Sequence, residues 1–92
     1  MEKKVLFEDL FGSRIRGNIL KTLALNEELT ISELIRKTRL NHSIVMKHLK
    51  ILQMIDFVQE KKFGRTKIYR YRIENTKAKK LKDFIEIFVV DF

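Results

Sequence analysis

Residues 30–58 of the chain, TISELIRKTRLNHSIVMKHLKILQMIDFV, carry most of the information about its fold. Thr30 followed three positions later by Glu33 is a capping box, which predicts the start of a short helix. Asn41 is a favourable N-cap for a second helix, from His42 to about Ile55. This second helix has one inward-facing apolar stripe, formed by Val45, Leu49, Leu52 and Ile55. Two helices joined by a turn of roughly three residues predict a helix-turn-helix unit over about 30–55.

The segment that follows changes from helical periodicity to strand periodicity. Residues 57–63 and 66–73 suit two strands, and Gly64-Arg65 between them suits a tight hairpin turn. Alternation predicts one face with Tyr69, Tyr71 and Ile73 and an opposite face with Arg70 and Arg72. Core packing of the tyrosines is favoured over base stacking, and phosphate contact by the two arginines stays open.

Further helical patterns flank this unit on both sides. Residues 5–11 are apolar and suit one or two helical turns, and residues 13–25 suit a helix with a serine N-cap. A terminal helix capped by Asn75 or Thr76 is expected over about 75–91, with an apolar second half. An apolar surface this broad near a chain end needs a second surface to cover it.

The charge of the chain is concentrated in its centre. The 92 residues carry a net charge of +8, and residues 36–72 alone hold eleven basic and two acidic side chains. The remainder is nearly neutral, with nine basic and ten acidic residues. This distribution favours a binding face for a polyanion such as nucleic acid over a uniformly solvated surface.

Composition argues against several other classes of protein. The sequence has no cysteine, which excludes disulfides, zinc–thiolate clusters and thiol chemistry. No apolar run reaches the ~18–20 residues of a membrane span, and no catalytic or phosphate-loop motif is present. The two histidines, His42 and His48, lie six positions apart and do not form a metal-binding pair on one helical face. We therefore expect no enzyme activity, cofactor, metal or membrane contact, and no effector can be identified.

The order of these motifs resembles that of ArsR-like and MarR-like winged helix-turn-helix regulators of bacteria and archaea. The resemblance spans about residues 13–73. It rests on the pattern Leu40, Asn41, Val45, His48, Leu49, Leu52, Asp56, Phe57 and Val58, and on a hairpin similar to the family's G-R…Y-R-L. Asp56 stands where the family usually has glycine. The resemblance implies one mainly α (α+β) domain over 1–92, with a three-helix core, a two-stranded wing over about 57–73 and a C-terminal dimerisation helix.

The resemblance also implies sequence-specific binding of double-stranded DNA, with the second helix of the unit in the major groove and the wing on the backbone or minor groove. Exposed polar and basic residues there suit base edges and phosphates. The expected DNA-binding residues are Arg36, Lys37, Arg39, Asn41, His42, Ser43, Met46, Lys47, Lys50, Lys61, Lys62, Arg65 and Lys67. His48 is expected to be a packed residue at the edge of the core, and the lysines of the terminal helix a solvated face.

The apolar ends of the chain are expected to pair across a twofold axis in a homodimer. The predicted interface residues are Val5, Leu6, Leu10, Phe11, Leu81, Phe84, Ile85, Phe88 and Phe92. Two alternatives stay open, a sequence-neutral architectural DNA-binding protein and a winged-helix module that binds another protein. We expect a cytoplasmic, nucleoid-associated transcription regulator, and the Lys- and Ile-rich composition favours an archaeal or viral source.

Overall fold

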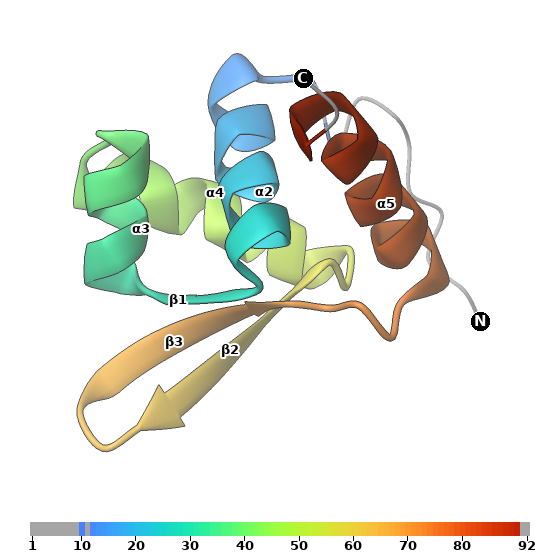
Figure 1. Ribbon diagram of the computed structural model, residues 1–92. Helices are drawn as coiled ribbons and strands as arrows, with labels where there is room; N and C mark the ends of the chain where they lie inside the picture. The colour runs from blue at the N-terminus through green and yellow to red at the C-terminus, as the bar shows by residue number, and fades with distance from the viewer. Residues whose placement is uncertain (1–9, 11, 91–92) are drawn as a thin grey trace.

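The computed structural model describes residue 10 and residues 12–90 of the chain. Three helices lie above a small sheet, a fourth helix stands beside α2, and a hairpin extends beyond the helices (Figure 1). The elements follow the order α2 (Arg14–Asn26), β1 (Glu28–Thr30), α3 (Ile31–Thr38), α4 (His42–Met54), β2 (Val58–Phe63), β3 (Thr66–Tyr71) and α5 (Thr76–Val90). This is the winged helix-turn-helix fold that the sequence predicts. Within the described residues, no helix is both long and apolar enough to cross a membrane.

Local caps set the start of each helix. The Ser13 hydroxyl accepts a hydrogen bond from the backbone of Arg16 at 3.3 Å at the start of α2. At α3, the Thr30 hydroxyl accepts from Glu33 N at 3.1 Å while the Glu33 carboxylate accepts from Thr30 N at 2.9 Å, so the predicted capping box is present. The Asn41 side chain caps α4 in the same way, at 2.9 Å from Ile44 N. These side chains satisfy backbone donors that a helix leaves unpaired.

The turn between α3 and α4 is set by one left-handed residue. Arg39 has φ 60° and ψ 30°, and its N–H donates to Ile35 O at 2.8 Å, which ends α3. A second left-handed residue, Asp56 with φ 63°, follows α4. Glycine reaches this region without strain, and aspartate tolerates it better than most residues. The backbone therefore explains why a glycine is usual at the position of Asp56.

The sheet has three antiparallel strands in the order β1-β3-β2, one more than the sequence predicts. Strand β1 pairs with β3 from Glu28 opposite Arg70 to Thr30 opposite Ile68. Three residues are too short for a period of two to be visible, so only this distant pairing defines the strand. The prediction that the second hairpin strand reaches Ile73 is wrong, because β3 ends at Tyr71, and Ile73 beyond it is 47% exposed.

The core lies between the helices and the upper face of the sheet. It unites the buried residues Ile19, Leu20, Leu23, Ala24, Leu29, Leu34, Val45, Leu49, Leu52, Phe57, Val58, Tyr69, Tyr71 and Ala78. The predicted inward stripe of α4 is buried at Val45, Leu49 and Leu52, and Ile55 packs against its edge. Both tyrosines of β3 are buried, so they pack in the core as the sequence predicts.

Helix α5 is attached to the body by polar contacts as well as apolar ones. The Tyr71 hydroxyl donates to Ala78 O at 2.6 Å, and Asn75 caps the helix through Lys77 N at 3.0 Å. The Lys82 side chain is mostly buried and pairs with Glu27 at the end of α2 at 3.0 Å. These contacts fix one side of α5 against α2 and leave its other side outward.

Candidate nucleic-acid interface

The N-terminal half of α4 presents a polar surface opposite its buried stripe. His42, Ser43 and Lys47 are exposed, and Lys50 continues the same surface one turn later. Asn41 is exposed at the cap. Because Val45, Leu49 and Leu52 hold the other side of the helix in the core, these polar side chains point away from the domain. The helix therefore offers hydrogen-bonding groups and two cations on one face.

Met46 differs from its neighbours on this helix. It is half-buried and packs against the core, and its sulfur accepts a hydrogen bond from the Tyr69 hydroxyl at 3.5 Å. Burial raises the pKa of Tyr69, so this hydroxyl stays a donor at neutral pH. Met46 thus joins α4 to β3, and its predicted contact with bases stays a prediction.

An open groove of about 380 Å³ separates the start of α4 from the hairpin turn. Three segments of the chain line it: the start of α3, the start of α4 and the hairpin beyond its turn. The lining residues are Thr30, Ile31, Ser32, His42, Met46, Arg65, Thr66 and Lys67. The fold therefore brings His42, Arg65 and Lys67, predicted from separate motifs, around one depression.

The cations of α3 lie elsewhere. Arg36 and Lys37 occupy the last turn of α3 and Arg39 its C-cap, whereas the groove is lined by the first residues of that helix. All three side chains are exposed. They flank the turn that leads into α4, so they extend the basic surface beside α4 and do not enter the groove.

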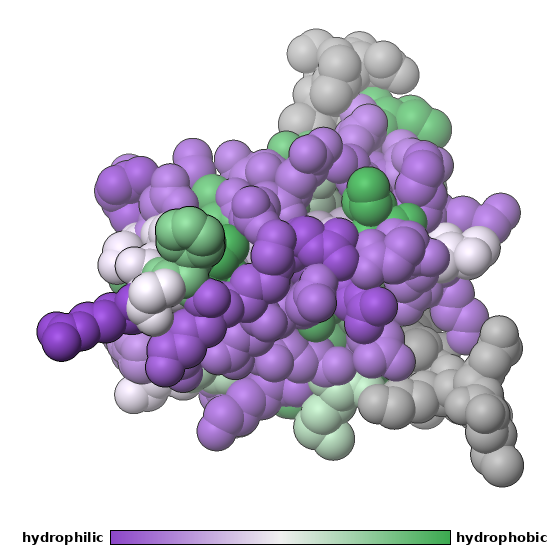
Figure 2. All heavy atoms as spheres, turned by 90° about the horizontal axis from the view of Figure 1, so that it is seen from below, coloured by the Kyte–Doolittle hydropathy of each residue, from purple (hydrophilic) through white to green (hydrophobic). Residues whose placement is uncertain are grey.

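Some basic residues of the hairpin form ion pairs with carboxylates, and others do not. Lys61 pairs with Glu28 of β1 at 2.9 Å, and Lys67 lies 3.6 Å from Glu60 on the neighbouring strand. Within residues 12–90 no carboxylate pairs with the basic residues Arg36, Lys37, Arg39, Lys47, Lys50, Lys62 and Arg65. The hairpin surface seen in Figure 2 is largely hydrophilic. Gly64, with φ +63°, allows the tight turn that places Arg65 at the end of the hairpin.

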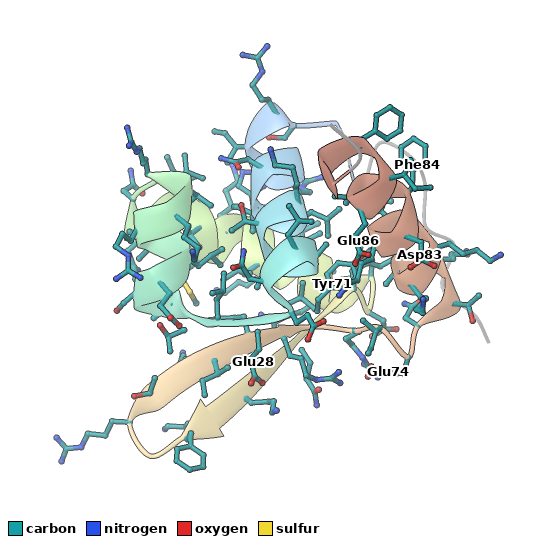
Figure 3. All side chains as sticks on the ribbon, in the orientation of Figure 1. Glu28, Tyr71, Glu74, Asp83, Phe84 and Glu86 are labelled. Carbon is teal, nitrogen blue, oxygen red and sulfur yellow. The ribbon has the colours of Figure 1, made fainter. Side chains whose placement is uncertain are left out.

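Arg70 of β3 and Arg72, which follows the strand, have carboxylate partners. Arg70 Nη2 lies 2.6 Å from Glu74 and also donates to Gln59 at 2.7 Å, while Arg72 Nε lies 3.0 Å from the same Glu74. The hydrogen bonds from Arg70, aided by a backbone donor and by Arg72, lower the pKa of Glu74 to about 2. These arginines hold the connection into α5, labelled at Glu74 in Figure 3, and whether they also contact phosphates stays open.

His48 lies on the inner side of α4, as predicted. Its side chain is buried, and its Nδ1 accepts a hydrogen bond from Arg16 Nε of α2 at 3.3 Å. Burial, together with the nearby charges of Arg16 and Lys47, lowers the pKa of His48. A neutral imidazole therefore links α2 to α4. Among the described residues, no group of three side chains could hold a metal ion.

Aromatic side chains cover the outer side of α5. Phe84 is 57% exposed and Phe88 55%, and their ring centroids are 4.7 Å apart. Phe84 points away from the body in Figure 3, and Ile87 is exposed beside it. Among the other predicted interface residues, Leu10, Leu81 and Ile85 pack partly against the core, while Val5, Leu6, Phe11 and Phe92 lie outside the described residues.

Sequence reasoning missed several residues of these surfaces. Glu28 pairs with Lys61, 33 positions away, and no sequence pattern signals such a pair, whereas the partners of Glu74 lie within four positions of it. Phe63, which is 79% exposed beside the hairpin turn, belongs to a strand pattern in which apolar residues are expected to be buried. The sequence marks Thr30 and Ser32 only as residues at a helix start. Their position on the groove follows from the packing of three segments.

Comparisons with known proteins agree with this geometry. The model of the bacterial regulatory protein, arsR family, matches residues 13–60. HlyU from Vibrio cholerae N16961 is 25% identical, with TM-score 0.75 over 88% of this chain and 85% of that one. A comparison with curated proteins gives no match.

Two further solved structures share the fold. NolR from Sinorhizobium fredii is 22% identical, with TM-score 0.72 over 90% of this chain and 80% of its own. The transcriptional repressor BigR from Xylella fastidiosa is 18% identical, with TM-score 0.72 over 88% of this chain and 83% of that one. These source organisms are bacteria, and the archaeal or viral origin expected from composition stays a prediction. The family match, the fold and the basic surface together show that the chain belongs to the arsR family of bacterial regulatory proteins and is a winged helix-turn-helix transcription regulator.

Proposed function

We propose that this regulator binds a specific, two-fold symmetric sequence of double-stranded DNA as a homodimer. Helix α4 enters the major groove, and the hairpin contacts the backbone and the adjacent minor groove. The observation that carries the proposal is the surface shared by α4 and the hairpin. Lys47 and Lys50 are exposed on α4 without a carboxylate partner in the described chain, and so is Arg65, which lines the hairpin side of the groove next to α4.

This surface suits the two tasks of DNA recognition. Lys47, Lys50, Lys62 and Arg65 supply charge that neutralises phosphates and releases counterions, which gives affinity without sequence preference. Ser43 and Asn41 supply neutral hydrogen-bonding groups at the exposed start of α4, where they can reach base edges. Phosphate contacts set the position of the domain, and base contacts select the sequence.

Dimerisation is supported by the outer side of α5. An aromatic pair and Ile87 stay exposed on a domain of only 92 residues, which buries a modest share of its surface when it folds alone. A twofold axis at this helix buries the same residues from both chains. In such a dimer, two α4 helices about one DNA turn apart, ~34 Å, match two half-sites.

The experiment is the selection of bound sequences from random duplex DNA at ~0.15 M salt. An enriched motif with twofold symmetry is the expected result. Tight binding without any enriched motif would instead indicate a sequence-neutral architectural protein. Absence of binding would indicate that the basic surface serves a protein partner, and would overturn the proposal.

Two hydroxyl variants locate the base-reading helix. Ser43→Ala should relax the preference at one position in each half-site, because the hydroxyl contact with that base is lost. Thr76→Ala, which removes an exposed hydroxyl at the start of α5 and away from the groove, should leave the motif unchanged. If Ser43→Ala selects the same motif with the same stringency as the parent, α4 does not read bases at Ser43.

A further inference from the structure

One residue of the hairpin has no explanation in the packing of the domain. Phe63 is 79% exposed, more than any other large hydrophobic side chain that the structure describes. It is the last residue of β2, directly before the two-residue turn, and its partner across the hairpin is Thr66. The hairpin is held to the core by Val58, Tyr69 and Tyr71 at its other end. The ring of Phe63 therefore contributes little to the core.

Basic residues adjoin this ring along the chain. Strand alternation places Phe63 on the same face as Lys61, which pairs with Glu28 at 2.9 Å, while Lys62 faces the other side and Arg65 follows in the turn. Lys62 and Arg65 have no carboxylate partner among the described residues. An apolar ring bordered by cations matches a surface that is apolar in the middle and anionic at both edges.

The minor groove of duplex DNA has this character. Phosphates line both of its edges, and sugars and base edges form its walls and floor. Proteins that bind there combine basic side chains with apolar wedges, which partly open a base step and bend the duplex. The hairpin extends beyond the helices in Figure 1, so its turn reaches past the contact surface of α4.

We infer that Phe63 is an apolar wedge that enters the DNA minor groove beside Arg65, where it selects deformable base steps. This inference rests on the proposed DNA binding and adds a specificity-determining residue to it. Pyrimidine–purine steps open most easily, so they should be favoured where the hairpin lands, outside the bases read by α4.

A single tryptophan tests the inference directly, because the chain contains none. Phe63→Trp should show emission quenched on duplex DNA and reduced access to acrylamide, since its ring meets bases. Ile73→Trp is the matched control. Its position is exposed but lies beyond the opposite end of β3, and its emission should change little. If the indole of the Phe63→Trp protein is equally accessible with and without bound DNA, the inference is overturned.

A second variant separates the contribution of the Phe63 ring to DNA binding from that of the neighbouring positive charge. Phe63→Ala should bind a duplex with flanking pyrimidine–purine steps about tenfold more weakly and bend it less, with an unchanged salt slope. Lys62→Ala should instead reduce the salt slope by about one. A parent protein that binds no duplex would contradict the proposed function itself. A parent that binds, with Phe63→Ala equal to it in affinity and bend, would overturn only the wedge.

Discussion

The hairpin turn and the outer side of α5 both expose phenylalanine rings, but in different surroundings. Phe63 stands alone next to a turn bordered by cations that have no carboxylate partner in the described chain. Phe84 and Phe88 contact each other, and Asp83, directly before Phe84, pairs with Lys79 at 3.0 Å. Exposure alone therefore does not identify a partner. In our proposals the charge around each ring therefore distinguishes two partners, DNA at the hairpin and a second copy of the chain at α5.

The largest effect is expected on self-association, when charged residues replace the exposed aromatic residues of α5. The double substitution Phe84→Asp with Phe88→Asp should weaken self-association by about 1,000-fold, because aromatic residues at an interface centre dominate its affinity. Sedimentation equilibrium measures this change. The control Ile73→Asp alters another exposed apolar residue and should leave the mass unchanged. A double variant that sediments like the parent would show that α5 is not the interface.

The next effect concerns the basic surface. Lys47→Glu combined with Lys50→Glu should weaken duplex binding by about 100-fold at ~0.15 M salt and flatten its salt dependence, because phosphate contacts are lost. Fluorescence anisotropy with a labelled duplex measures both. Lys80→Glu reverses a charge on α5 and should cost little by comparison. Equal losses in both proteins would mean that net charge, and not this surface, determines affinity.

A smaller effect on DNA affinity is expected at Glu28, whose carboxylate neutralises Lys61 of the hairpin. Glu28→Gln should raise duplex affinity about threefold, because Lys61 is released from its 2.9 Å pair and one negative charge disappears. Asp83→Asn removes the same charge on α5 and should change affinity less. Figure 3 shows how far apart Glu28 and Asp83 lie. If both variants bind alike, Lys61 makes no separate contact with DNA.

The smallest effect is expected on the free energy of unfolding, through His48, which links α4 to α2. His48 has a lowered pKa in the folded state, so protons bind preferentially to the unfolded chain. Its neutral form is present in both states above pH 6.5, and the free energy of unfolding should fall as pH decreases below about 6.5. Urea unfolding at several pH values measures this slope. A His48→Gln protein with the same slope as the parent would show that the burial of His48 does not cause this pH dependence.

The helices could be predicted from sequence because their signals are local. Ser13, Thr30 and Asn41 lie within three residues of the groups that they cap, so the sequence shows both partners. The apolar stripe of α4 also follows from spacing within one helix. Strand β1 could not be predicted, because its three residues are defined only by pairing with β3, about forty positions away.

The candidate site was predictable in part for the same reason. Exposure of His42, Ser43 and Lys47 follows from the helical period. The half-buried state of Met46, bonded to Tyr69, depends on how α4 meets the sheet. The pair between Lys61 and Glu28, 33 positions apart, likewise emerges only in three dimensions. Sequence therefore indicated which residues reach the surface, while packing decided which of them have partners within the chain.

The mass of the complex with duplex DNA tests the central claim most directly. Light scattering after size-exclusion chromatography, with a duplex that carries the selected motif, should give two chains of 11.1 kDa per duplex. A duplex that carries one half-site should bind far more weakly. One chain per duplex with equal affinity for both DNAs, or no complex at ~0.15 M salt, would contradict a dimer that reads DNA through α4 and the hairpin.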